Sequence, residues 1–215
     1  MSPRLLRIEP AHPPTTSLQA AAAACRGCHA CPLYLHATQA VFGEGPPHAS
    51  LMLVGEQPGD EEDRRGHPFV GPAGGLLERA LTGAGIPRDD VYVTNAVKHF
   101  KWKPNETGKR RLHDKPKGNE IRACRPWLLD ELGLVQPHVV VAMGATAASS
   151  LFGTRAQVMR DHGHVLTLAV EEGGPVVKAV LTIHPSAALR APTPEGRHEL
   201  LEMLVGDLRV ARAAI

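Results

Sequence analysis

The chain has 215 residues, of which 43% are hydrophobic, and its formal net charge at neutral pH is +2. That length suits one α/β domain with a sizeable core and is short for two, so we expect a single domain over 1–215. No apolar run approaches the roughly 20 residues that span a bilayer, and the N-terminus lacks the apolar stretch of a secretory signal. We therefore expect a soluble, cytoplasmic monomer.

Short apolar runs alternate with amphipathic segments along the chain. Residues 1–16 are proline-rich and aperiodic, which predicts a loose lead-in before a helix capped by Ser17. Near-continuous apolar strands separated by helices are typical of a parallel sheet covered on both faces. We predict an α/β fold, a three-layer αβα sandwich around a mostly parallel four-stranded sheet. Predicted strands cover 51–54, 91–94, 138–142 and 176–183, with 165–170 as a candidate fifth, and predicted helices cover 74–84, 120–132, 145–152 and 195–211.

Polar residues follow the predicted strands. The run Leu51–Val54 stops at Gly55, and the segment that follows is polar and rich in glycine and proline. The other strands lead to Asn95, Gly144 and His184. In open α/β sheets, ligands bind in the crevice beyond the carboxyl ends of the strands. The sequence therefore predicts a binding or catalytic site at this edge.

A basic segment lies between the second strand and the next helix. From 98 to 117 there are eight Lys or Arg and two acids, a local balance of +6. Such charge is typical of contact with a phosphate backbone, and equally of a solvated surface loop. A connection of this length is unusual unless it is functional or disordered. Nucleic acid is therefore one candidate partner.

The four cysteines form a spaced pattern. Cys25, Cys28 and Cys31 are arranged CxxCxxC, and Cys124 lies far downstream in ACRPWLL. In a chain without a secretory signal, clustered cysteines favour metal ligation over disulfides. The residues alone indicate a metal without identifying it.

Several motifs resemble those of one family. GEQPG at 55–59, PFVGPAG at 68–74 and HPSAALR at 184–190 resemble the iron–sulfur, type 4 uracil-DNA glycosylases. Gln57 in the first motif and GKRRLH at 108–113 are similar to the UdgX-like branch of that family. The resemblance covers most of the chain. It implies base-excision DNA repair, with uracil-containing DNA as partner and single-stranded DNA accepted.

The resemblance also implies a [4Fe–4S] cluster held by Cys28, Cys31 and Cys124. In the family pattern a further cysteine stands where this chain has His99, in NAVKHF. UdgX-like members are similar in carrying this histidine, so His99 is the predicted fourth ligand and Cys25 is surplus. Two alternatives stay open: Cys25 in place of His99, and a zinc site on the same residues.

For the uracil pocket, the resemblance indicates Asn95 and Phe69. An amide offers one donor and one acceptor to the uracil edge, and a ring offers a stacking face. Cleavage produces a cationic sugar and an anionic base, so carboxylates beside one and a donor beside the other lower both charges. Glu56 and Asp60 are predicted to face the sugar, and His184 to bond uracil O2. The other predicted substrate contacts are Gln57, Glu62, Asp63 and Ser186.

The final histidine of the basic loop carries the most specific prediction. In the UdgX-like branch this residue attacks the sugar C1′, so the DNA stays bonded to the protein. By resemblance His113 is the nucleophile, Glu56 its proton acceptor and Arg111 the residue that positions the loop. Lys109 and Arg110 are expected to hold phosphate. A turnover glycosylase that uses activated water, and a non-catalytic DNA binder with a structural metal site, remain alternatives.

Overall fold

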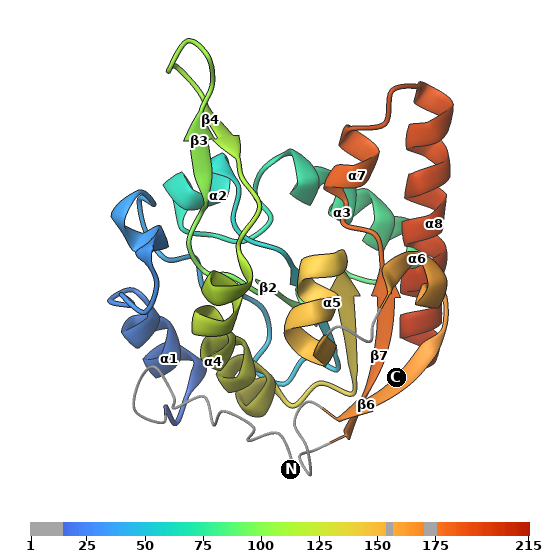
Figure 1. Ribbon diagram of the computed structural model, residues 1–215. Helices are drawn as coiled ribbons and strands as arrows, with labels where there is room; N and C mark the ends of the chain where they lie inside the picture. Colours follow the sequence, from blue (N-terminus) through green and yellow to red (C-terminus); the bar gives the residue numbers. More distant parts are fainter. Residues whose placement is uncertain (1–14, 154–156, 170–175) are drawn as a thin grey trace, which may run out of the picture.

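The computed structural model describes residues 15–153, 157–169 and 176–215, so the predicted lead-in at 1–16 lies almost wholly outside the described residues. At its centre is a five-stranded sheet with strand order β2-β1-β5-β7-β6 (Figure 1). The first four strands are parallel, and β6 runs antiparallel to β7. The strands are β1 (Leu51–Gly55), β2 (Val91–Asn95), β5 (Val139–Met143), β6 (Val165–Ala169) and β7 (Val176–Thr182).

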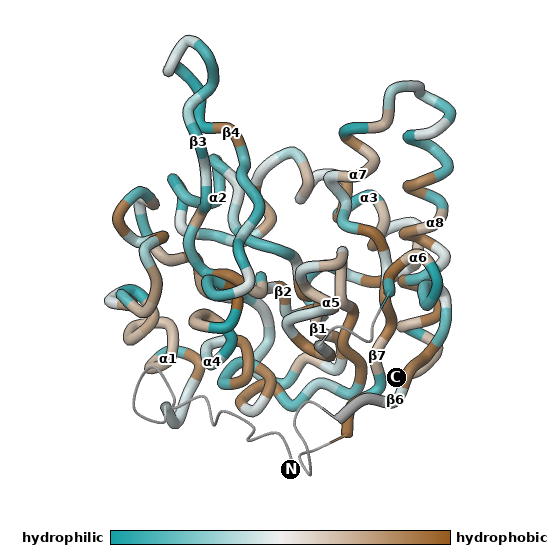
Figure 2. Tube along the Cα trace, in the orientation of Figure 1, coloured by the Kyte–Doolittle hydropathy of each residue, from teal (hydrophilic) through white to brown (hydrophobic). Residues whose placement is uncertain are grey.

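Helices cover both faces of the sheet, which gives the predicted three layers. Alternate residues of a strand point to opposite faces. Leu51 and Leu53 therefore join the core beneath α3 and α8, whereas Met52 and Val54 join the core beneath α4 and α5. Figure 2 shows the apolar residues gathered in the strands between these layers. The covering helices are α3 (Pro72–Ala84), α4 (Gly118–Val135), α5 (Ala145–Phe152) and α8 (Pro194–Ala213).

Shorter elements surround this sandwich. The first helix, α1, begins after Ser17, whose hydroxyl accepts the N–H of Ala20 as predicted. A two-stranded antiparallel hairpin, β3–β4, extends beyond the carboxyl edge of the main sheet (Figure 1). The remaining elements are α1 (Leu18–Cys25), η1 (Pro32–Leu35), α2 (Asp60–Arg65), η2 (Arg88–Asp90), β3 (Trp102–Pro104), β4 (Arg111–His113), α6 (Val158–Asp161) and α7 (Ser186–Leu189).

The fold class is as predicted, with three corrections. The sheet has five strands rather than four, because β6 pairs with the outer edge of β7. The basic segment is not a plain loop, since it folds into the β3–β4 hairpin. Helix α4 begins at Gly118 rather than after Asn119, because the Glu120 carboxylate accepts the N–H of Lys117 and so caps the first turn.

The parallel sheet brings the predicted strand ends together. Residues Gly55 and Asn95 are paired in register at the ends of β1 and β2. Met143 and Thr182 are paired at the ends of β5 and β7. The loops that follow these strands therefore open on the same edge, and the hairpin lies beside them.

Candidate active site

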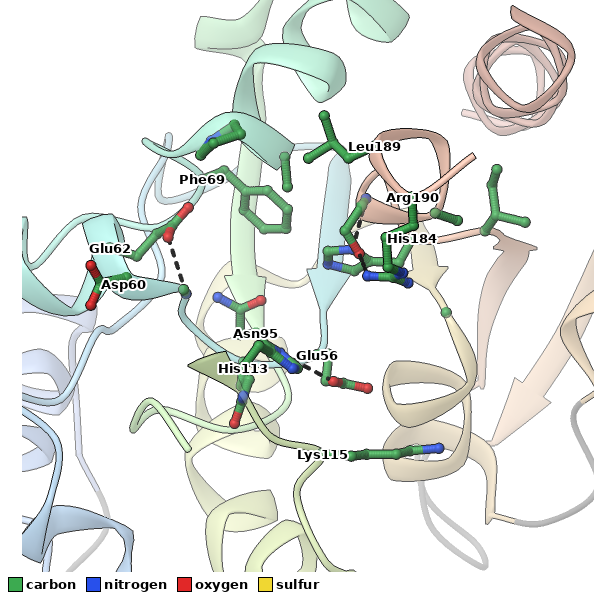
Figure 3. A pocket seen from close by; sticks show the side chains of 18 of the residues that line it. Glu56, Asp60, Glu62, Phe69, Asn95, His113, Lys115, His184, Leu189 and Arg190 are labelled. Atoms are coloured by element: carbon green, nitrogen blue, oxygen red, sulfur yellow. Dashed lines mark hydrogen bonds and ion pairs between the residues drawn. The ribbon is translucent and has the colours of Figure 1, made fainter. Parts of the chain in front are cut away.

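A cavity of about 740 Å³ lies at the carboxyl edge of the sheet (Figure 3). Its walls come from the loop after β1, the end of β2, the hairpin, the start of α5 and the segment through α7. Most of the predicted site residues are brought together here. Those that line the cavity are Glu56, Gln57, Asp60, Glu62, Phe69, Asn95, His113, His184 and Ser186.

Gly55 lies at the point where the side chains of Asn95, Phe69 and His184 converge. A Cβ placed on Gly55 would overlap the Asn95 side-chain oxygen. It would also lie 2.7 Å from Phe69 Cζ and 3.4 Å from His184 Nε2. Only a residue without a side chain leaves this approach open. No motif marked Gly55, although a glycine at the end of a buried strand is the signal for such a close approach.

Phe69 is held in an unusual backbone conformation. Its φ of +58° lies in the left-handed region, which bulky residues rarely adopt. A Cβ on Gly74 would overlap the carbonyl oxygen of Phe69, so the first turn of α3 packs directly against this backbone. The ring stacks against that of His184 with centroids 6.1 Å apart and planes at 27°. The aromatic face is therefore fixed beside the histidine.

His184 is a neutral hydrogen-bond donor. Its Nδ1 accepts the backbone N–H of Ser186 at 3.1 Å and lies 2.8 Å from the Ser186 hydroxyl. A neutral ring whose Nδ1 accepts must carry its proton on Nε2. Burial, reinforced by the charges of His113 and Arg190, lowers the pKa of His184 to about 4. At neutral pH the Nε2–H group therefore faces the space beside Asn95 and Phe69.

His113 and Glu56 form a pair on the opposite side of the cavity. His113 Nε2 lies 3.4 Å from Glu56 Oε1 (Figure 3), and the histidine side chain is 49% exposed. The other carboxylate oxygen of Glu56 accepts a hydrogen bond from the Thr146 hydroxyl. Burial lowers the pKa of His113, and the negative charge of Glu56 opposes this effect. At neutral pH the pair is an uncharged imidazole beside a carboxylate.

Arg111 fastens the hairpin to α2. Its guanidinium donates to Asp60 Oδ1 at 2.5 Å and to Asp63 Oδ2 at 2.6 Å. It also lies over the rings of Phe100 and Trp102, 5.4 Å and 5.6 Å from their centroids. Asp63 is fully buried and lies outside the cavity lining, so its place in the structure is that of an anchor for Arg111. The register of β4 then fixes His113 two residues further on.

Two predicted substrate-contacting side chains, Gln57 and Glu62, form their hydrogen bonds with backbone groups of the protein. The Gln57 amide donates to the carbonyls of Lys101 and Asp114 and accepts the N–H of Lys101, each at 3.1 Å. It thereby joins the two legs of the hairpin. The Glu62 carboxylate accepts the N–H groups of Gly59 at 3.0 Å and Gly71 at 2.9 Å. Both side chains hold the loops that carry the site.

Lys109 and Arg110 lie at the exposed tip of the hairpin, outside the cavity lining. Figure 2 shows this end of the hairpin as hydrophilic. The cavity is also lined by two cationic residues that were not predicted to be site residues, Lys115 and Arg190. Arg190 donates to the Ser186 hydroxyl at 2.9 Å. No motif marked Lys115, whereas Arg190 closes the HPSAALR motif.

A sequence model of the uracil DNA glycosylase superfamily matches residues 42–208. The chain belongs to the uracil DNA glycosylase superfamily. It is 39% identical to the type-4 uracil-DNA glycosylase of Thermotoga maritima over 189 residues, which cover 87% of this chain and 89% of the relative. The corresponding protein of Pyrobaculum aerophilum is 37% identical over 183 residues, covering 81% and 85%, and that of Saccharolobus solfataricus is 35% identical over 193 residues, covering 88% and 82%.

In this member of the superfamily the four cysteines lie around Trp127 and are free thiols. The indole N–H of Trp127 donates to Cys28 Sγ at 3.2 Å, and the backbone N–H of Lys98 donates to Cys124 Sγ at 3.1 Å. Burial raises the pKa of the Cys25 thiol, and the charges of Cys124 and Cys28 add to that effect. Burial also raises the pKa of Cys124, to about 12.

His99, the predicted fourth ligand, is buried, but the charged groups that act on it differ from those that act on the Cys25 thiol. Burial lowers the pKa of His99, and the charges that act on it are those of Asp63 and His29. Among the described residues, no three His, Cys, Asp or Glu side chains are already arranged to hold a metal ion. Four thiols in one core region nevertheless match the soft donor set that iron–sulfur clusters and zinc require. The described helices include none that is both long and apolar enough to cross a membrane.

Proposed function

We propose that this protein is a uracil-DNA glycosylase that excises uracil from DNA and remains bonded, through His113, to C1′ of the resulting abasic sugar. The observation that carries the proposal is the pairing of His113 with Glu56 in the cavity, Nε2 to Oε1 at 3.4 Å. The names of the type-4 relatives support the glycosylase activity. The GKRRLH segment at 108–113 supports the covalent outcome, because it resembles the corresponding loop of UdgX-like proteins.

In the proposed reaction, uracil occupies the space between Asn95, Phe69 and His184. The bond between N1 of uracil and C1′ breaks, and its electron pair leaves with the base. The neutral His184 donates its Nε2 proton in a hydrogen bond to uracil O2, which stabilises the leaving anion. A donor that is already neutral and fixed in orientation needs no rearrangement as this charge develops.

On the other side of the sugar, Glu56 lowers the energy of the cationic C1′. The His113 nitrogen that carries the lone pair then forms a bond to C1′, and the imidazolium gives the proton of its other nitrogen to the Glu56 carboxylate. The lowered pKa of His113 supports this role, because only the neutral ring has a lone pair to donate. Arg111, held by Asp60 and Asp63, keeps the hairpin in place during this step.

The proposed partner is uracil-containing DNA. Single-stranded DNA is included, because an unpaired uracil enters the cavity without the cost of opening a base pair. Lys109 and Arg110 are proposed to contact phosphates from the exposed hairpin tip, and Ser186 to contact a phosphate near the cavity. We retain a monomer acting in the cytoplasm as the working hypothesis.

The thiols around Trp127 support a [4Fe–4S] cluster as the resident cofactor. Cys28, Cys31 and Cys124 are the proposed ligands with His99 as the fourth, and Cys25, which packs in the same buried cluster as Cys124, is the alternative. A bound cluster would supply a structural cross-link between the segment after α1 and helix α4. Elemental analysis of the purified protein distinguishes iron from zinc.

The test is a denaturing gel of the metal-replete protein after incubation with a labelled uracil-containing oligonucleotide, beside a thymine control. We expect a band that survives SDS and heat only with uracil. His113→Ser should abolish this band while uracil release continues, because water can then complete the reaction. Alkali-cleavable abasic DNA without a stable band would identify a turnover glycosylase. Salt-sensitive binding without uracil release would identify a non-catalytic DNA binder.

A further inference from the structure

Glu56 accepts a hydrogen bond from a residue that no sequence motif marked. Thr146 is the second residue of α5, is only 2% exposed, and donates its hydroxyl proton to Glu56 Oε2. The other carboxylate oxygen, Oε1, faces His113. We propose that Thr146 is a positioning residue that fixes the rotamer of Glu56 and so presents Oε1 to His113. This inference rests on the proposed function, since it concerns the same covalent step.

The carboxylate needs such a partner because its surroundings leave it room to turn. Glu56 follows the end of β1 and lines a cavity of about 740 Å³, and its side chain is 23% exposed. Thr146 is well suited to hold it, because a β-branched side chain in a helix has few χ1 rotamers. Its position in the first turn of α5 also places the anion near the positive end of the helix.

The charges around His113 make the orientation of Glu56 matter. The groups that act on the imidazole are Glu56, Arg190, Asp114 and His184. Arg190 disfavours a cationic ring, whereas Glu56 and Asp114 favour one. Glu56 is the group in direct reach of Nε2. If its carboxylate rotated away, the imidazolium formed on attack would lose its proton acceptor while Arg190 still opposed its charge.

Substitutions at this position separate orientation from packing. Thr146→Val keeps the shape of the side chain and removes the hydroxyl, whereas Thr146→Ser keeps the hydroxyl and removes a methyl. Ser150→Ala is a matched control, because Ser150 lies one turn further along α5 and is 3% exposed. Its hydroxyl has no hydrogen-bond partner among the described residues.

The experiment measures the rate of adduct formation on a uracil-containing oligonucleotide with protein in excess. Thr146→Val should slow the adduct about tenfold or more, because small misplacements of a catalytic group carry costs of this size. Thr146→Ser should recover most of the rate, and Ser150→Ala should match the wild type. In a Glu56→Ala background, Thr146→Val should have no further effect, because the group that it positions is already absent.

Three outcomes would overturn the inference. These are a Thr146→Val variant as fast as the wild type, a Thr146→Ser variant as slow as Thr146→Val, and an undiminished effect of Thr146→Val in the Glu56→Ala background. Equal melting temperatures establish that the variants are folded, and Thr146→Ala replaces Thr146→Val if that variant does not fold. A wild type that forms no adduct contradicts the proposed function instead, so the two failures are distinguishable.

Discussion

The two sides of the cavity are built in different ways. The base side consists of Gly55, Asn95, Phe69 and His184, which sit on the ends of buried strands or pack directly against α3. The sugar side carries His113 on a hairpin outside the main sheet. That hairpin is held by polar contacts, chiefly those of Arg111 and Gln57. In the proposed reaction, base recognition would therefore depend on the core, whereas covalent capture would depend on the hairpin.

Under the proposed function, this difference should make uracil release and covalent capture separable by mutation. Changes at the strand ends should damage both activities, because no reaction starts without a bound base. Changes at the hairpin contacts should damage capture alone.

Gly55→Ala should remove both activities. The added methyl group would overlap the Asn95 side-chain oxygen and crowd Phe69, so uracil could not bind between them. We expect uracil release to fall by about 10² or more, since a steric fault at the reacting base displaces it from its catalytic groups. Single-turnover release of labelled uracil measures this loss. Gly75→Ala is the control, because a Cβ there meets no atom within 4 Å. Unimpaired uracil release by Gly55→Ala would contradict the proposal that uracil binds where the side chains converge on Gly55.

Arg111→Lys should slow capture and spare release. An ammonium cannot reproduce the forked contacts to Asp60 and Asp63, so the hairpin loosens and His113 moves relative to C1′. We expect about tenfold slower adduct formation, with uracil release within about twofold of the wild type. Parallel gel and uracil-release assays measure both rates. Arg64→Lys is the control, because Arg64 pairs with the same Asp60 from the surface of α2. An equal loss of both activities would remove the distinction between the two sides.

The sequence pattern predicted that the strand ends meet at one edge, whereas the roles given to residues on both sides of the cavity rest on motif resemblance. Apolar runs such as Leu51–Val54 identify buried strands, and a parallel sheet then brings their ends together. The β3–β4 hairpin escaped this reasoning because its strands have only three residues each, and half of their side chains are charged or polar. Strands this short contain too little periodicity to be recognised from the sequence pattern.

The roles of single polar residues were equally hidden in the sequence. Gln57 lies in the GEQPG motif and Glu62 follows it, and both line the cavity, yet their hydrogen bonds go to backbone groups of the loops. Thr146 lies 90 residues from Glu56 in the sequence. Such contacts depend on side-chain direction across the sheet edge, which spacing along the chain does not encode.

The smallest predicted effect concerns pH. Burial lowers the pKa of His113 below its ordinary value of 6.5, so the ring keeps its lone pair as the pH falls through that value. The adduct rate should therefore fall less between pH 7.5 and 6.0 than the roughly fourfold loss of a histidine of ordinary pKa. Release depends on His184, whose pKa is about 4, and should stay constant to lower pH than capture. Coincident acid limits for the two activities would argue against separate histidines.

Peptide mapping of the adduct tests directly whether His113 becomes bonded to DNA. The protein is incubated with a uracil-containing oligonucleotide, digested with trypsin and nuclease, and analysed by tandem mass spectrometry. Cleavage after Arg111 and Lys117 releases the peptide that contains His113, because trypsin does not cleave the bond between Lys115 and Pro116. We predict that this peptide carries the abasic sugar on its histidine. An adduct on another residue, or the peptide recovered only in unmodified form from active protein, would contradict the account.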